Sequence, residues 1–111
     1  MKTSIRPLDR ETAVEYASWF KALADATRIQ LVTLLARSRE AMSVGEIVVS
    51  SGVGQSTVSH HLKILSDVGF VLVERRGTAS FYRINDACVS CFPSAADVVM
   101  GSPLPALPQP S

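Results

Sequence analysis

The chain has 111 residues, of which 47% are hydrophobic and 19% charged, and its formal net charge is +1. This profile fits one globular domain with a modest core, and it excludes a disordered or strongly basic chain. Two cysteines are too few for a secreted disulfide framework, and neither a signal peptide nor a membrane span is visible, so a cytoplasmic protein with reduced thiols is expected.

The first half of the chain predicts three helices. Residues 1–10 form a flexible leader, and from residue 13 to 24 apolar side chains recur at intervals of three and four, as on one face of a helix. Asp25 is a good N-cap for a second helix, whose apolar face carries three leucines between residues 31 and 35. Ser43 and Glu46 have the spacing of a capping box, which opens a short third helix from Val44 to about Val49.

The second half predicts a fourth helix and a hairpin. Residues 50–54 include two glycines, and a helix follows from Gln55 to Asp67, with Gly69 where it ends. Two short helices joined by a glycine-containing turn are typical of a helix-turn-helix. The period then changes to two over residues 70–75 and 80–84, which flank Gly77, so a β-hairpin is expected there. The predicted fold class is therefore mainly α with a small β-hairpin, a winged helix-turn-helix.

The C-terminal region predicts a broken helix and a tail. We expect Pro93 to interrupt the helical pattern, leaving a short turn around Cys88–Cys91 and a helix from about Pro93 to Met100. Residues 101–111 hold four of the six prolines and are expected to be disordered or extended. The folded domain is thus predicted to cover residues 11–100, with a sensor and dimerisation segment at its C-terminal end.

The fourth helix has two contrasting sides. Val58, Leu62 and Leu65 lie on the side that must face a core, with His61 at its edge, where a hydrogen-bonded core imidazole is expected. The opposite side carries hydroxyl, amide and imidazole groups, which are suited to base edges. The candidate DNA contacts are Gln55, Ser56, Thr57, Ser59, His60 and Lys63 on this helix, with Arg75 and Arg76 at the hairpin for phosphates or the minor groove. A solvated helix face and a solubilising arginine pair are the alternatives.

Two sequence runs carry a family resemblance. The runs are Leu23–Arg28 (LADATR) and Gln55–Lys63 (QSTVSHHLK), and the second is highly specific. With the hairpin, they make residues 20–84 resemble the ArsR family of metal- and metalloid-responsive repressors. Family members usually have proline where this chain has Ala26, a first helical position where proline is favoured but not required. The resemblance implies a homodimer on an inverted-repeat DNA operator, released when an inducer binds.

The inducer site departs from the commonest family patterns. The stretch Met42–Ile47 has no cysteine, and the Asp and His ligands of a zinc-type site on the last helix are absent. Cys88 and Cys91 remain, and trivalent arsenic and antimony prefer thiolates. Some arsenic-responsive members carry their thiols near the C-terminus, and this chain resembles them. Two thiols complete a methylarsenite site, whereas arsenite usually takes a third ligand.

These residues lead to one functional expectation and several alternatives. The expected protein needs no cofactor to fold and is a repressor that leaves DNA when Cys88 and Cys91 bind arsenite, methylarsenite or antimonite. Other possibilities are control by another thiophilic metal (cadmium, lead or zinc), a thiol–disulfide switch, and a structural cysteine pair. An enzyme is not expected, because the sequence has no phosphate loop, no plausible triad and no βαβ unit around the Cys-x-x-Cys pair.

Overall fold

The computed structural model describes residues 5–101, apart from the side chains of residues 88–94. Most of this region is helical. In chain order the elements are α1 (Arg10–Ala22), α2 (Ala26–Ser38), β1 (Met42–Ser43), α3 (Val44–Ser51), α4 (Gln55–Asp67), β2 (Val71–Arg76), β3 (Ala79–Ile84) and α5 (Asp86–Val99). The first four residues of the expected leader and nearly all of the expected proline-rich tail lie outside the described residues.

The helices begin where side chains bond their first free amides. Asp9 accepts a hydrogen bond from the Thr12 amide at the start of α1, and Asp25 accepts one from the Arg28 amide at the start of α2. The predicted capping box of α3 is confirmed, since the Ser43 hydroxyl and the Glu46 carboxylate each bond the other residue's backbone amide. Each such cap stabilises its helix by about 1 kcal/mol.

The hairpin is confirmed, and one strand joins it that the sequence did not predict. The sheet has the order β1-β3-β2 and is antiparallel, with Val71 opposite Ile84 and Arg76 opposite Ala79 in the hairpin. β1 pairs Met42 with Tyr82 and Ser43 with Phe81. A strand of two residues shows no period in a sequence, which is why it was missed. We call the β2–β3 hairpin the wing, and α3 with α4 is the helix-turn-helix. Because β1 pairs with β3 and precedes α3 directly, the wing is joined to the helix-turn-helix.

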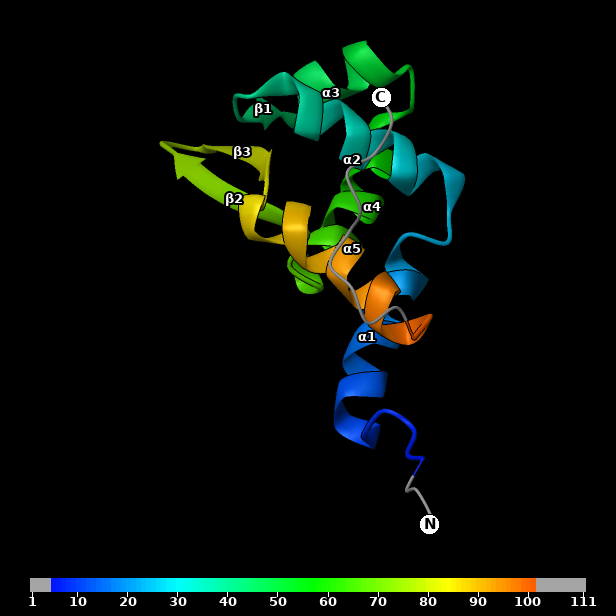
Figure 1. Cartoon of the computed structure of the whole chain (residues 1–111). Helices are drawn as coiled ribbons and strands as arrows, with labels where there is room; N and C mark the ends of the chain where they lie inside the picture. The colour runs from blue at the N-terminus through cyan, green and yellow to red at the C-terminus, as the bar shows by residue number, and fades with distance from the viewer. Residues whose placement is uncertain (1–4, 102–111) are drawn as a thin grey trace.

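The core lies between the helix-turn-helix and the base of the sheet (Figure 1). Helices α2, α3 and α4 each direct apolar residues into it, and β2 closes it. Its fully buried large side chains are Leu31, Leu35, Ile47, Val58, Leu62, Leu65 and Val71. This packing fixes which face of α4 remains outside.

The C-terminal end of α5 lies beside α1, whereas the first turn of α5 follows β3 next to the sheet (Figure 1). Trp19 of α1 is half-buried; it packs against the core of its own chain and lies 5.2 Å from the Tyr16 ring. In the part of the chain that the structure describes, no helix is long and apolar enough to cross a membrane.

The expected break at Pro93 is wrong, because α5 runs without interruption from Asp86 to Val99. A proline within a helix removes one backbone hydrogen bond and usually bends the helix, but helical residues on both sides of it still bond their own partners. Asn85 caps the first turn of α5, and Ala95 is fully buried beyond the proline. The helix is therefore held before the proline by its cap and after the proline by Ala95. The backbone of residues 88–91 is helical, where a turn was expected.

Candidate nucleic-acid interface

Helix α4 separates its core side chains from its exposed ones as predicted. Val58, Leu62 and Leu65 are fully buried, while the six polar candidates, Gln55, Ser56, Thr57, Ser59, His60 and Lys63, are all exposed. Gly54 occupies the N-cap position and has no side chain to bond the first-turn amides. These amides are left to face an anionic group such as a phosphate. The helix thus offers short hydrogen-bonding groups at the end that enters a groove in helix-turn-helix proteins.

Lys63 has an acidic neighbour on the same helix. Its ammonium lies 3.5 Å from the carboxylate of Asp67, and both side chains are well exposed. Ion pairs of this kind contribute little in water, so Asp67 does little to hold the Lys63 ammonium in place.

The two candidate arginines of the wing differ in their partners. The Arg76 guanidinium donates to Glu74 at 2.9 Å and lies 4.4 Å from the centre of the Phe81 ring. Arg75 instead donates to the neutral hydroxyl of Ser80 at 2.9 Å. Arg75 therefore keeps its full charge at the surface.

Glu74 was not among the residues singled out from the sequence. It accepts hydrogen bonds from Arg76 and from Arg83, the latter at 2.7 Å, and these bonds hold the pKa of the Glu74 carboxyl below its ordinary value. Its position in β2, two residues before Arg76, was a visible signal, but the cross-strand partner Arg83 required the register of the hairpin. Glu74 orders the arginines on this face of the wing.

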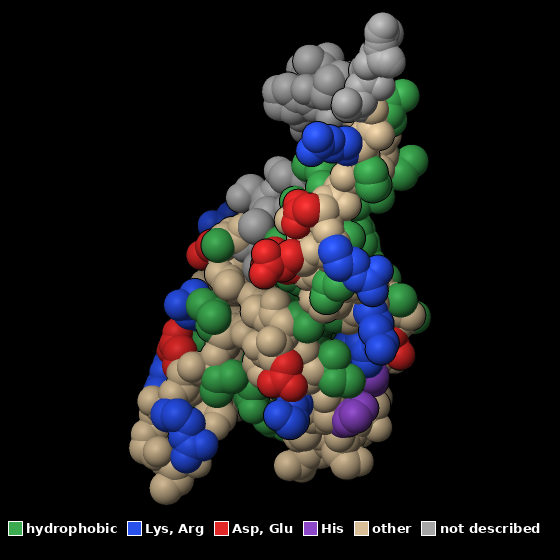
Figure 2. Space-filling model, turned by 90° about the horizontal axis from the view of Figure 1, so that it is seen from below, with side chains coloured by type: hydrophobic (Ala, Val, Ile, Leu, Met, Phe, Trp, Pro, Cys, Tyr) green, Lys and Arg blue, Asp and Glu red, His purple; other side chains and the backbone are tan. Residues whose placement is uncertain are grey.

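The candidate contacts lie on two separate parts of the surface. Figure 2 shows positively charged side chains on the wing, at the lower left, and further ones beside the histidines, at the right, with an open notch between the two. The candidate residues of α4 and those of the wing tip therefore form two separate surfaces on the molecule.

His61 faces the interior, as predicted. It is only 9% exposed, and its Nδ1 lies 3.0 Å from Nη1 of Arg28, so the expectation of a hydrogen-bonded core imidazole is confirmed. Arg28 itself was not anticipated as the partner, because 33 residues separate the two in sequence.

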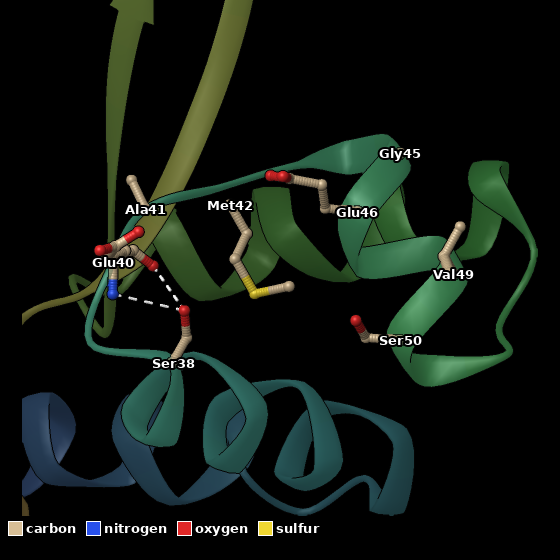
Figure 3. A pocket seen from close by; sticks show the side chains of 8 residues that line it. All are labelled: Ser38, Glu40, Ala41, Met42, Gly45, Glu46, Val49 and Ser50. Atoms are coloured by element: carbon tan, nitrogen blue, oxygen red, sulfur yellow. Dashed lines mark hydrogen bonds between the residues drawn. The ribbon is translucent and has the colours of Figure 1, made fainter.

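A cavity of about 460 Å³ lies beside the stretch that has no cysteine (Figure 3). The Met42 side chain extends toward it between the end of α2 and α3, and Glu46 lies at its edge. The Glu46 carboxylate already bonds the Ser43 amide. Among the residues whose side chains are described, no group of three histidine, cysteine, aspartate or glutamate residues is placed to hold a metal ion. The side chains of Cys88 and Cys91 lie outside that description.

The fold and this surface define a winged helix-turn-helix DNA-binding transcriptional regulator, and not an enzyme. The family model of the bacterial regulatory protein, arsR family, matches residues 25–72. The chain is 33% identical to the HTH-type transcriptional regulator NmtR of Mycobacterium tuberculosis, over 76% of this chain and 68% of the relative. It is 39% identical to the arsenical resistance operon repressor of Bacillus subtilis, over 65% and 68%.

A solved structure agrees with these relatives. The homodimeric winged helix-turn-helix domain Mb0332 of Mycobacterium bovis, described as a possible ArsR-family regulator, superposes with a TM-score of 0.66 at 30% identity, covering 87% of this chain and 91% of that one. The chain belongs to the ArsR family of transcriptional repressors, whose members respond to metals and metalloids.

Proposed function

We propose that this chain is a homodimeric repressor of an inverted-repeat operator, released by arsenite, methylarsenite or antimonite bound to Cys88 and Cys91. The observation that carries the DNA-binding part is the exposed polar face of α4 opposite its buried apolar face, together with the wing arginines. In the proposal, the first turn of α4 contacts bases, while Arg75 and Arg76 contact the sugar-phosphate backbone or the minor groove.

The proposed dimer is supported by an apolar surface on α1 and α5. A cavity of about 350 Å³ there is lined by Leu8 and by Tyr16 and Phe20 of α1, together with Val98 and Val99 of α5. Val98, Val99 and Met100 are 47%, 52% and 81% exposed, although all three are apolar. A contiguous exposed apolar surface of this kind marks an interaction site, and a second copy of the chain is its proposed occupant. The homodimeric state of the M. bovis domain agrees with this choice.

The inducer part is supported by how α5 connects to α4. Residues 88 and 91 belong to one continuous helix, and positions three apart on a helix are neighbours on its surface. Asn85 caps this helix, and its side-chain amide donates to the Gly69 carbonyl at 2.8 Å, two residues after α4 ends. A ligand that moves the start of α5 therefore acts directly on the end of the recognition helix. The thiols must stay reduced for this chemistry, so the proposal places the protein in the cytoplasm.

The chemistry of the proposed site is thiolate coordination. Trivalent arsenic and antimony are soft and prefer sulfur ligands. Two cysteines satisfy methylarsenite, whereas arsenite takes its third ligand from a small molecule or another side chain. Half-sites about one helical turn apart must be met by both α4 helices at once, so a small rotation of one subunit against the other weakens binding strongly.

The test is a fluorescence anisotropy titration with a labelled duplex from the promoter beside this gene. The reduced protein is bound first and then challenged separately with arsenite, methylarsenite, antimonite, cadmium, lead and zinc. The same series is run on the variant Cys88→Ser/Cys91→Ser, with Ser90→Ala as the matched control between the two positions. Release by a trivalent arsenical or antimonite alone, lost only in the double variant, supports the proposal.

Other outcomes assign other roles. Release by cadmium, lead or zinc through the same cysteines would show that the inducer is one of these metals and that the proposed site is correct. A mass lower by two hydrogens after mild peroxide, accompanied by release, indicates a thiol–disulfide switch. An operator complex that survives every ligand and oxidant contradicts a sensing role for the pair.

A further inference from the structure

One arginine side chain connects three helices at the back of the recognition helix. Arg28 lies in the first turn of α2, and its Nε donates to the carbonyl of Ala22, the last residue of α1, at 2.6 Å. Its Nη1 lies 3.0 Å from Nδ1 of His61 in the middle of α4. Its own backbone amide bonds the Asp25 carboxylate at 3.1 Å, which fixes the start of α2. The guanidinium therefore holds the end of α1 and the buried side of α4 at a fixed separation.

This contact requires one protonation state of the imidazole. A guanidinium has donors only, so His61 must accept at Nδ1 and carry its single proton on Nε2. A proton on Nδ1 would remove the acceptor and bring two positive charges to a separation of 3.0 Å. Because His61 is 9% exposed, little water is available to replace the lost bond or to screen the charges.

Two charged side chains at the start of α2 interact with this imidazole. Arg28 and Asp25 approach it from the start of α2, and Asp25 interacts with it electrostatically. His60, on the same helix, has its ring centre 5.5 Å away. From α1, the uncharged Ala22 carbonyl accepts from the same guanidinium. The Asp25 carboxylate attracts the Arg28 charge, and it already accepts a hydrogen bond from the Arg28 amide.

We propose that Arg28 is a positioning residue that sets α4 against the end of α1 by donating to His61, and that loss of this contact weakens operator binding. The inference rests on the proposed function, because it assumes that α1 holds the dimer together and α4 contacts the operator. His60 and Ser59, on the exposed side of α4, move with the backbone that His61 anchors. A change in the angle of α4 relative to α1 then displaces both recognition helices of the dimer from their half-sites.

The test compares the operator affinity of the wild type with that of three variants. Arg28→Met removes the guanidinium donor, and Arg28→Lys is the conservative rescue. His61→Gln is the matched control, because its side-chain amide oxygen still accepts from Arg28. His61→Gln should bind within about threefold of the wild type, well below the roughly tenfold change of a typical coupling free energy.

Arg28→Met should bind about tenfold more weakly than the wild type, with Arg28→Lys between the two. Far-ultraviolet circular dichroism and sedimentation confirm that each variant is folded and has the oligomeric state of the wild type. Arg28→Met with wild-type affinity overturns the proposal, as does His61→Gln that binds as weakly as Arg28→Met.

A second measurement does not depend on DNA. Nitrogen-15 NMR of the free wild-type protein at about pH 8 should show His61 with an unprotonated Nδ1 and a proton on Nε2. The opposite tautomer overturns the proposal. If the protein binds no operator, the proposed function fails, whereas this spectrum still decides whether the Arg28–His61 contact exists.

Discussion

Replacing Arg75 by alanine should reduce the salt dependence of operator binding. Arg75 is exposed at the end of β2, and its hydrogen-bond partner is the neutral Ser80 hydroxyl at 2.9 Å. A cation that neutralises one phosphate contributes about 0.9 to the slope of log affinity against log salt. The proposed dimer carries two copies, so the slope should become less steep by about 1.8.

This slope converts into a measurable ratio. Between 50 and 200 mM salt, a fourfold change, the wild type should lose about twelvefold more affinity than Arg75→Ala. The measurement is anisotropy of a labelled operator at four or more salt concentrations. Arg10→Ala is the matched control, because Arg10 opens α1, away from the wing (Figure 1).

Arg76→Ala should change the slope less than Arg75→Ala, since Glu74 already neutralises part of the Arg76 charge at 2.9 Å. Equal slopes for the wild type and Arg75→Ala would refute a phosphate contact at this residue. An equal change for Arg10→Ala would show that the effect follows net charge alone.

Three further predictions concern stability and assembly. Ile47→Ala should destabilise the protein by about 2–5 kcal/mol in urea unfolding, because Ile47 is fully buried. Val49→Ala on the same helix is the control, and it should change the stability by less than about 0.5 kcal/mol because Val49 is 85% exposed. Val98→Glu should convert the dimer into a monomer in sedimentation velocity, whereas Val49→Glu should leave the dimer intact. If both variants remain dimers, the apolar surface of α1 and α5 is not the dimer interface. The hydrogen bond from the Arg28 amide lowers the pKa of Asp25 in the folded state below its ordinary value of 3.8. The ionised carboxylate therefore stabilises the fold above about pH 3.8, and this stabilisation is lost as the pH falls through the lowered pKa. Asp25→Asn, which still caps α2, should therefore flatten the loss of urea stability between about pH 5 and pH 2, and an unchanged profile would exclude this contribution.

The predictable parts of the fold were those determined by neighbours in sequence. The Ser43–Glu46 capping box, the apolar side of α4 and the two-residue period of the hairpin all involve residues within a few positions of each other, and the structure has each of them. Their local geometry follows from backbone donors, side-chain acceptors and a single buried side.

The missed features depend on contacts between distant segments. Two residues of β1 become a strand only because β3 lies beside them, and the period of Met42 and Ser43 alone carries no such information. The continuity of α5 past Pro93 involves contacts with distant segments on either side of the proline, which are the bond from Asn85 to the Gly69 carbonyl and the burial of Ala95. The candidate site divides in the same way: the exposed residues of α4 were predictable, whereas the partners of Glu74 and His61 were not.

Ser43 has a second consequence for how the protein meets DNA. It is both the N-cap of α3 and the partner of Phe81 in the sheet, so no linker separates the helix-turn-helix from the wing. The wing cannot swing away without breaking the first turn of α3. In the proposed complex, the distance between the bases that α4 contacts and the phosphate that Arg75 contacts is therefore fixed within one subunit, and variable spacing is accommodated between the two subunits. Operators of this protein should vary in the gap between half-sites more readily than in the length of a half-site.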